Sequence, residues 1–204
     1  MSTTSSSPRL DEPIPIALAN TIWSDRTGVH DAFADLNDAA TWLRAAGDRL
    51  SLTPVFGREE VITTESARRL VDLRDAIRRL AAEHTHDPRR LGQSPISDLR
   101  AATSMVNMAS ALSSMWPELR GGEDSFTRRD AWTGESTADA ATSAIARETI
   151  ELVTSPQWQQ LRPCTAPGCA YYFVKQHFRQ QWCSAVCGNR ARVARHAAQL
   201  HHKT

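Results

Sequence analysis

The feature that most constrains this chain is a set of four cysteines, all of which lie within 24 residues near its C-terminal end. They are spaced as C-x4-C, thirteen residues and C-x3-C, and they are Cys164, Cys169, Cys183 and Cys187. Two close pairs separated by an insert of hairpin length can fold back so that four thiolates bind one tetrahedral ion, with Zn–S distances of about 2.3 Å. We therefore predict a zinc site. The alternatives are two disulfides, four unbound thiols or an iron–sulfur cluster.

The predicted zinc is structural rather than catalytic. Four thiolates fill its coordination sphere, whereas catalytic zinc usually has three protein ligands and an open position for water. His177 lies between the two cysteine pairs and is a lesser candidate that could replace one cysteine as ligand. The start of the chain lacks the apolar region of a secretory signal, and no apolar stretch approaches the roughly 18–20 residues of a membrane helix. We expect a cytoplasmic protein, in which reducing conditions favour zinc over disulfides.

The residues around the cysteines predict a hairpin followed by a helix. The insert AYYFVKQHFRQQW begins with strand-favouring side chains and turns through polar ones, which predicts a two-stranded hairpin inside the insert. The segment GNRARVARHAAQLHH predicts a helix, with the second cysteine pair at its start. A stripe at 3.5-residue spacing consists of Val186, Arg190, Val193, Ala197 and Leu200.

The charge of this C-terminal piece differs from that of the rest of the chain. Residues 162–204 carry seven Lys or Arg and no acid, a formal charge of +7, which leaves −6 for the first 161 residues. An acid-free basic segment is typical of a surface that meets phosphates. A solvated helix that pairs with the acidic N-terminal domain is the alternative. The predicted nucleic-acid-binding residues are Lys175, Arg179, Arg190, Arg192, Arg195 and Gln199.

The rest of the chain predicts a larger, mainly helical domain. We expect a disordered tail over residues 1–12, a domain over 13–160 and the basic cysteine-rich finger over 161–204. Residues 14–22 predict a short strand or buried apolar segment, and the glycines at 121 and 122 predict a turn between two strands. Helices are expected over 31–47, closing at Gly47, from Thr64 to about His84, from Ser94-Pro95 to about Met108, and over 136–155. The fold class is α+β, with a small hairpin-and-helix, treble-clef-like finger.

No nucleotide-binding, nucleophile-turn or metalloprotease motif occurs in the chain, so an enzyme is not expected. The favoured function is a DNA-binding regulator in which the finger contacts DNA and the acidic N-terminal domain senses a ligand or forms a dimer. A homodimer is expected because a second finger adds phosphate contacts. Trp23, Trp42, Trp116 and Trp132 are expected in the core, and several together could line a pocket for a small effector in the N-terminal domain. The alternative is a zinc-stabilised module that docks protein or RNA.

The string WCSAVCGNR, preceded by C-x4-C and an aromatic stretch, resembles the CGNR zinc-finger family, in which the finger follows an N-terminal ABATE domain. The segments IALANTI, AATWLRAAG and SPQWQQLRPC are similar to the N-terminal part of that family. The resemblance implies a bacterial stress-related transcription regulator with the four cysteines as zinc ligands. Physical reasoning adds that Gly188 allows close backbone approach and that Asn189 hydrogen-bonds either the local backbone or a thiolate sulfur. Arg190 could reach a phosphate or lie buried between helix and hairpin.

Overall fold

The computed structural model describes residues 11–25, 27–50, 62–122, 125–133 and 136–201. Helices in these ranges are α1 (Ile14–Ala19), α2 (Leu36–Arg49), α3 (Thr64–Thr85), α4 (Leu99–Ser110), α5 (Thr137–Thr154), the 3-10 helix η1 (Pro156–Gln160) and α6 (Ala185–His201). Strands are β1 (Ile22–Ser24), β2 (Val29–Asp31), β3 (Met115–Gly121), β4 (Phe126–Trp132), β5 (Leu161–Pro163) and β6 (Tyr172–Val174). They pair as three antiparallel two-stranded sheets, β1–β2, β3–β4 and β5–β6. The α+β fold class and the mainly helical N-terminal part are confirmed.

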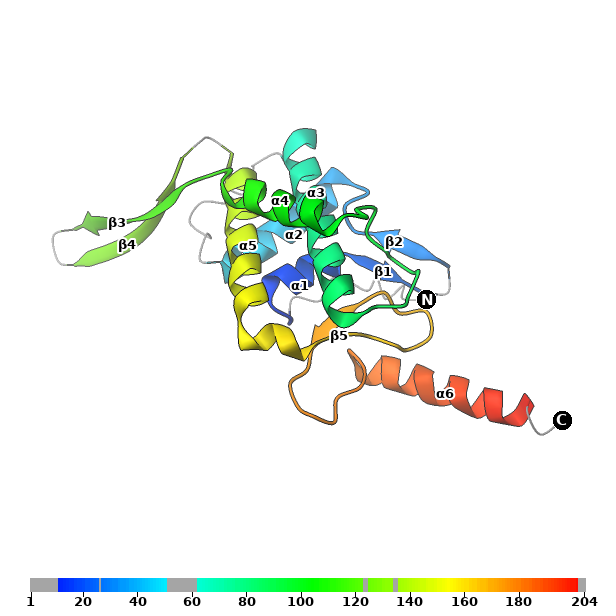
Figure 1. Ribbon diagram of the computed structural model, residues 1–204. Coiled ribbons are helices and arrows are strands. Elements are labelled where there is room, and N and C mark those ends of the chain that lie inside the picture. Colours follow the sequence, from blue (N-terminus) through cyan, green and yellow to red (C-terminus); the bar gives the residue numbers. More distant parts are fainter. Residues whose placement is uncertain (1–10, 26, 51–61, 123–124, 134–135, 202–204) are drawn as a thin grey trace.

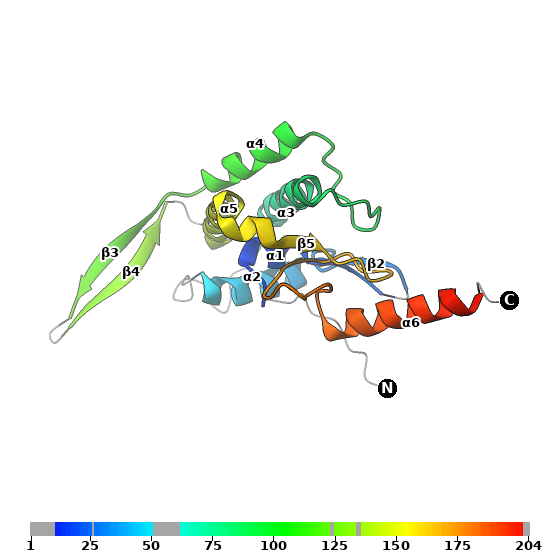
Figure 2. The ribbon, with the colours of Figure 1, turned by 60° about the horizontal axis from the view of Figure 1, so that its bottom comes forward.

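The N-terminal part is built around α3, which packs against α1, α4 and α5 (Figures 1 and 2). The helix begins after Thr63, whose hydroxyl accepts a hydrogen bond from the amide of Ser66, and ends at His86 in the left-handed conformation. Its stripe of Leu70, Leu73 and Ile77 is buried. The predicted helix over these residues is therefore confirmed, as are the helix over α5 and the strand pair β3–β4.

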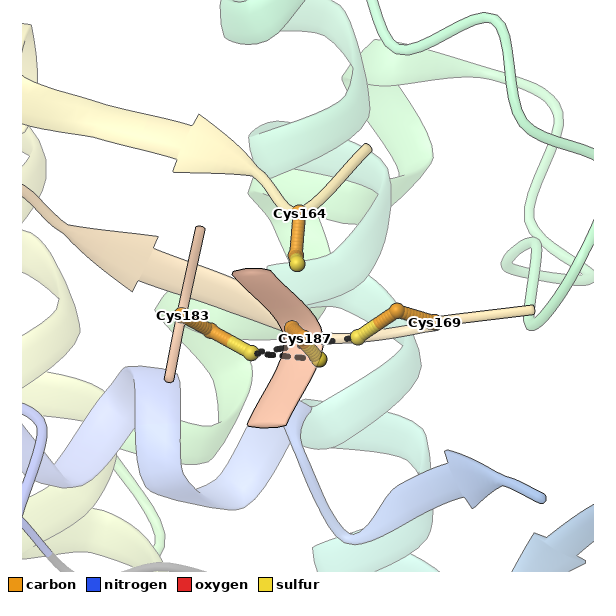
Figure 3. Close-up of side chains that lie close together, drawn as sticks. All are labelled: Cys164, Cys169, Cys183 and Cys187. Atoms are coloured by element: carbon orange, nitrogen blue, oxygen red, sulfur yellow. Dashed lines mark hydrogen bonds between the residues drawn. The ribbon is translucent and has the colours of Figure 1, made fainter. Parts of the chain in front are cut away.

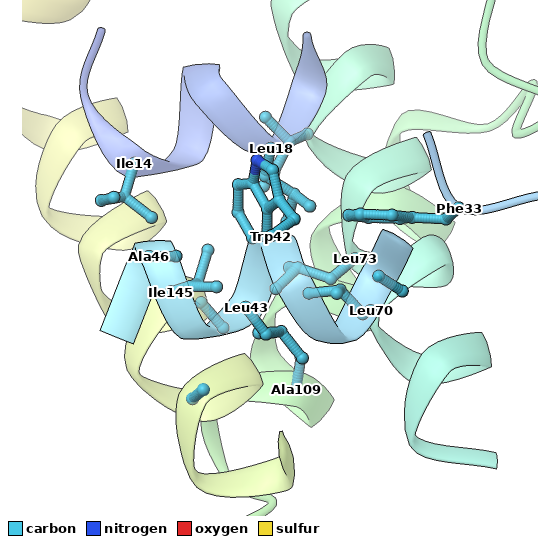
Figure 4. Packing of buried hydrophobic residues seen from close by; sticks show 14 of the residues in the cluster. Ile14, Leu18, Phe33, Trp42, Leu43, Ala46, Leu70, Leu73, Ala109 and Ile145 are labelled. Atoms are coloured by element: carbon cyan, nitrogen blue, oxygen red, sulfur yellow. The ribbon is translucent and has the colours of Figure 1, made fainter. Parts of the chain in front are cut away.

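The main core lies between these helices and α2. Trp42 is among its largest side chains and meets Phe33 edge to face, with ring centroids 5.6 Å apart. Figure 4 shows Leu18, Leu43 and Ile145 close to this pair, from α1, α2 and α5. Burial of Trp42 agrees with the expected core role of the tryptophans, whereas Trp116 on β3 is 43% exposed.

Three predicted elements have different bounds in the structure. Residues 14–19, expected as a short strand or a buried apolar segment, form the helix α1, and all six of its side chains are buried. The helix expected over 31–47 begins at Leu36 and continues through Gly47 to Arg49, because Asp35 caps its first turn. The helix expected at Ser94-Pro95 begins at Leu99, because Asp98 caps two amides there.

Two features project from the helical body. The β3–β4 hairpin extends away on one side and α6 on another, in both views (Figures 1 and 2). Among the described residues, no helix combines the length and apolarity that crossing a membrane requires. Most of the predicted disordered tail, residues 1–10, lies outside the described residues. Its last residue, Glu12, accepts a hydrogen bond from the amide of Val174 in β6 at 2.9 Å.

Candidate metal centre and nucleic-acid interface

The first cysteine pair lies on the connection between β5 and β6. Cys164 follows β5 directly, and its amide donates to the carbonyl of Tyr171 at 2.9 Å, just before β6 begins. Gly168 has a φ of 70°, a conformation that glycine adopts without strain, and precedes Cys169. The chain therefore reverses between the two cysteines and presents both thiols on the same side.

This hairpin differs from the predicted one. The strand at Tyr172–Val174 pairs with Leu161–Pro163, which precedes the first cysteine, rather than with the end of the insert. The two strands enclose the first cysteine pair, so the hairpin itself forms half of the site. No second strand is present within the insert over residues 175–182.

The second cysteine pair lies at the start of α6, as predicted. Cys183 comes just before the helix, and Cys187 lies in its first turn. The Ser184 hydroxyl accepts a hydrogen bond from the amide of Cys187 at 3.2 Å, which caps the helix between the two cysteines. One helical turn therefore fixes the separation of the second pair.

The four sulfur atoms converge on one point (Figure 3). All four cysteines are buried and unoxidised, and their Sγ atoms lie within 4.8 Å of one another. The Sγ of Cys183 lies 3.9 Å from that of Cys169 and 3.5 Å from that of Cys187. A tetrahedral ion with Zn–S distances of about 2.3 Å requires sulfurs roughly 3.8 Å apart. The donor set and the spacing both fit zinc, with no position left for water.

Other predicted ligands and supports lie elsewhere. His177 is exposed and is not part of the cluster. Asn189 is also exposed, and its side-chain oxygen accepts a hydrogen bond from Arg192 of the same helix. Gly188 does allow close approach: a Cβ there would lie 3.2 Å from Cε3 of Trp182. The indole therefore packs on the helix backbone beside the metal site.

Arg190 lies against the metal centre. Its Nη2 donates to the Sγ of Cys187 at 3.1 Å. Burial acts to lower the pKa of Arg190, but the hydrogen bond and the nearby thiolate outweigh burial and raise that pKa. Four thiolates around a divalent ion leave a formal charge of −2, which this guanidinium partly offsets. Arg190 is thus half-buried and held against Cys187, which is closer to the expected position between helix and hairpin than to a phosphate contact.

A second arginine, from the N-terminal part, holds the cysteine hairpin from outside. The Nη1 of Arg89 donates to the carbonyls of Cys164, Cys169 and Tyr171 at 3.1, 3.0 and 3.0 Å. Its Nη2 pairs with a carboxylate oxygen of Asp87 at 2.6 Å. Asp87 also accepts the hydroxyl of Tyr172 at 2.7 Å. This Arg89 clamp fixes the backbone that carries both cysteines of the first pair.

The clamp rests on a buried polar layer. Arg78, which is 1% exposed, donates to the carbonyls of Ala19, Gly92 and Ala170 at 2.5, 2.7 and 3.2 Å. Burial lowers the pKa of Arg78 to about 10, so it stays charged at neutral pH. Burial, and then the hydrogen bond to Asp87, raise the pKa of Tyr172 to about 12, so Tyr172 remains a donor.

An apolar cluster completes the contact between the two parts. Ile16 and Ala81 from the N-terminal helices pack with Leu161, Tyr172 and Val174 of the β5–β6 hairpin. Asn20 adds a pair of backbone hydrogen bonds to Tyr172, at 2.8 and 2.9 Å. The finger thus shares a core with the N-terminal part. Sequence reasoning missed Arg78 and Arg89 because an arginine in a polar stretch carries no local sign of burial.

The predicted nucleic-acid contacts lie on different sides of the finger. Lys175 follows β6, and its ammonium donates to the carbonyl of Phe178 at 2.8 Å. The exposed Arg179 has its guanidinium 5.1 Å from the centre of the Phe178 ring. Arg192, Arg195 and Gln199 are all exposed on α6. Lys175 and Arg195 line one cleft together, whereas Arg179 and Arg192 are not among the residues lining it.

The apolar stripe of α6 is not buried. Val186, Val193 and Leu200 are 74%, 69% and 57% exposed. The helix meets the rest of the finger through Cys187, Gly188 and, less deeply, Ala191. Its remaining turns extend beyond the body (Figure 2). The stripe is therefore open to a partner.

Two known protein families match successive parts of the chain. The ABATE family, described as "Putative stress-induced transcription regulator", matches residues 12–156, and the CGNR zinc finger matches residues 160–199. Neither is an enzyme family. No curated protein matches the chain. The ABATE match covers well over half of the chain, and the four thiolates converge within the matched finger. This chain therefore belongs to the ABATE family and carries a C-terminal CGNR zinc finger that binds zinc.

Proposed function

We propose that this protein is a cytoplasmic, non-catalytic regulator of transcription that binds DNA through its zinc finger. The observation that carries the proposal is the exposed, acid-free face of α6. Arg192 and Arg195 lie on this helix in solvent, and no carboxylate follows Glu151 in the chain. A helix of this kind, fixed at one end by zinc, fits a major groove or a phosphate backbone.

The docking of the finger supports regulation. The Arg89 clamp and the buried Arg78 connect the first cysteine pair to α3 and the loop that follows it. A ligand that shifts this part of the N-terminal domain would therefore shift the metal hairpin as well. An apolar hollow of about 140 Å³ between α3 and α4, lined by Leu73 and Met105, is a candidate effector site. Its volume, below the roughly 300 Å³ of common ligand pockets, restricts it to a small apolar molecule.

We also propose a homodimer formed along α6. Val186, Val193 and Leu200 recur at intervals of seven residues, the spacing of one seam position in a two-stranded coiled coil. Val186 and Val193 are 74% and 69% exposed, so a second copy of the helix can pack against this seam. A glutamate on the seam, Val193→Glu, is expected to give monomers in light scattering. Ala198→Glu, an exposed position off the seam, is the matched control and should leave the mass unchanged; equal masses for both variants would contradict the seam.

The proposed DNA binding can be tested by measuring the affinity of the protein for a random-sequence duplex, by fluorescence anisotropy, over a series of salt concentrations. The variant Arg192→Ala/Arg195→Ala should bind more weakly. Its plot of log affinity against log salt should be flatter by up to about 1.8, since each phosphate contact contributes about 0.9. Arg100→Ala, which removes an exposed arginine from α4, controls for overall charge. An unchanged slope in the double variant would show that these two arginines of α6 make no phosphate contacts.

The exposed Phe178, at 81%, favours a second candidate, a zinc-stabilised module that docks protein or RNA. A zinc-loaded protein that fails to bind duplex DNA at low salt would favour this function. A partner that stays bound in high salt and after nuclease treatment would identify protein rather than RNA as the target.

A further inference from the structure

A cleft of about 550 Å³ lies between the β5–β6 hairpin and α6. Arg162 of β5, Lys175 after β6 and Arg195 of α6 line it, and Trp182 forms part of its wall. Its volume falls within the roughly 300–1,000 Å³ of sites that enclose small ligands. The metal site positions both sides of the cleft, because Cys164 follows β5 directly and Cys187 lies in the first turn of α6.

The charge of the cleft selects an anion. Its three cationic side chains come from three separate segments of the finger, and none of the lining residues is acidic. The Nη1 of Arg162 donates to the carbonyls of Gln159 and Leu161 at 2.8 and 2.6 Å, which holds the guanidinium and leaves its other nitrogens free for a ligand. Lys175 uses one hydrogen on the carbonyl of Phe178, and an ammonium has three. A phosphate is an anion that can accept from several such donors at once.

The wall of the cleft offers a flat aromatic surface. Trp182 packs against Gly188, which has no Cβ to push the indole away, and the same tryptophan remains part-exposed in the cleft. Phe173 also lines the cleft but is 1% exposed, so Trp182 is the ring that a ligand can cover. Nucleobases stack on such rings with little dependence on base identity.

We propose that this cleft binds one unpaired nucleotide, with its phosphate between Arg162, Lys175 and Arg195 and its base against Trp182. The side chains of Thr165 and Gln181 line the same cleft and can donate to and accept from base edges. A base inside a duplex is stacked between its neighbours and cannot cover the indole. The ligand is therefore a nucleotide of a single strand or a free nucleotide, which goes beyond the duplex binding proposed above.

Calorimetry on the zinc-loaded full chain distinguishes these sources. The probes are thymidine 5′-monophosphate, thymidine, inorganic phosphate and an eight-residue oligothymidylate. The monophosphate should bind more tightly than thymidine or inorganic phosphate, because only it supplies both groups. Much tighter binding of the oligonucleotide than of the monophosphate would indicate single-stranded nucleic acid as the ligand. Equal affinities for these two probes would indicate a free nucleotide. No binding of either the monophosphate or the oligonucleotide would overturn the proposal.

Two exposed arginines of α6 form a matched pair for this test. Arg195→Ala should weaken binding of the nucleotide probe by about tenfold, the typical cost of a lost charge-assisted hydrogen bond. Arg192→Ala removes an arginine three residues away that does not line the cleft, and should change binding little. Equal losses in the two variants would show that only general charge matters and would refute the site. A variant that loses duplex binding but still binds the nucleotide affects only the regulator function. A variant that loses nucleotide binding but still binds duplex DNA affects only the cleft.

Trp182→Leu tests the stacking surface separately and should weaken binding by roughly 5- to 150-fold. Trp182→Phe keeps a flat ring against Gly188 and should retain most of the affinity. Zinc content and circular dichroism of both variants establish that the finger remains folded. Leucine and phenylalanine variants with equal, near-wild-type affinity would exclude stacking on this residue.

Discussion

Replacement of Arg89 by alanine is the perturbation that most directly probes how the finger is held. In the structure, Nη1 of Arg89 contacts three carbonyls of the cysteine hairpin at 3.0–3.1 Å, and the side chain is 13% exposed. Alanine removes all three contacts and also the guanidinium that pairs with Asp87, so that the Asp87 carboxylate keeps the hydroxyl of Tyr172 as a side-chain donor. The finger then keeps its apolar contacts but loses the clamp.

The size of the effect follows from the hydrogen atoms available. Nη1 carries two hydrogens, so at most two of its three contacts are full hydrogen bonds, each worth about 1.5–3 kcal/mol with a charged donor. The free energy of unfolding should therefore fall by about 3–6 kcal/mol, near the lower figure because water can reach the partly exposed site. If zinc binds only the docked hairpin, a loss of about 3 kcal/mol lowers the zinc affinity by at most about 150-fold.

Urea unfolding of the zinc-loaded protein and competition for zinc with a chromogenic chelator measure the two quantities. Arg90→Ala is the matched control, because Arg90 is the exposed neighbour of Arg89. We expect the control to stay within about 0.5 kcal/mol of wild type. Arg89→Lys keeps the charge but not the planar fork, and should be intermediate. Equal stability of Arg89→Ala and Arg90→Ala would refute the clamp.

Three further predictions concern the same region. Gly188→Ala should destabilise the protein by about 1 kcal/mol in urea unfolding, because the new Cβ would lie 3.2 Å from Trp182 and overpacking should exceed the usual helix gain of alanine; a stabilised variant would contradict this packing. Burial would raise the pKa of Asp87, but hydrogen bonds from Arg89 and Tyr172 outweigh it and lower that pKa, so this carboxylate stabilises the fold above about pH 4 and less as the pH falls further. The difference in unfolding free energy between wild type and Asp87→Asn should shrink from about pH 5 to about pH 3, and a constant difference would count against this contribution. Cys183→Ser should abolish stoichiometric zinc in elemental analysis and lower the helix content, whereas full zinc retention would mean that the cysteine is not a ligand.

The metal ligands could be predicted because their chemistry depends on residue type and spacing. Four cysteines in two close pairs occur in few kinds of site. A long helix such as α3 shows its buried stripe and its N-cap residue in the sequence. The short helix α1 could not be distinguished from a strand, because six buried residues show no polar face and cover less than two turns.

Contacts between distant residues were beyond prediction. The strand at β6 pairs with β5 across the cysteine turn, and strand propensity does not specify a partner. Arg78 and Arg89 reach carbonyls 92 and 75–82 residues away, whereas sequence rules place arginine at the surface. On α6, in contrast, apolar side chains at helical spacing are exposed. The spacing was evident in the sequence, but it does not specify whether another element covers these side chains.

The proposed function depends on binding of the zinc finger to DNA. The most direct test is selection of binding sites from a random-sequence duplex library by the zinc-loaded protein, repeated over a salt series. The account predicts enrichment of a motif, as two half-sites if the α6 seam forms a dimer, with affinity that falls steeply as salt rises. Absence of duplex binding even at low salt would contradict it.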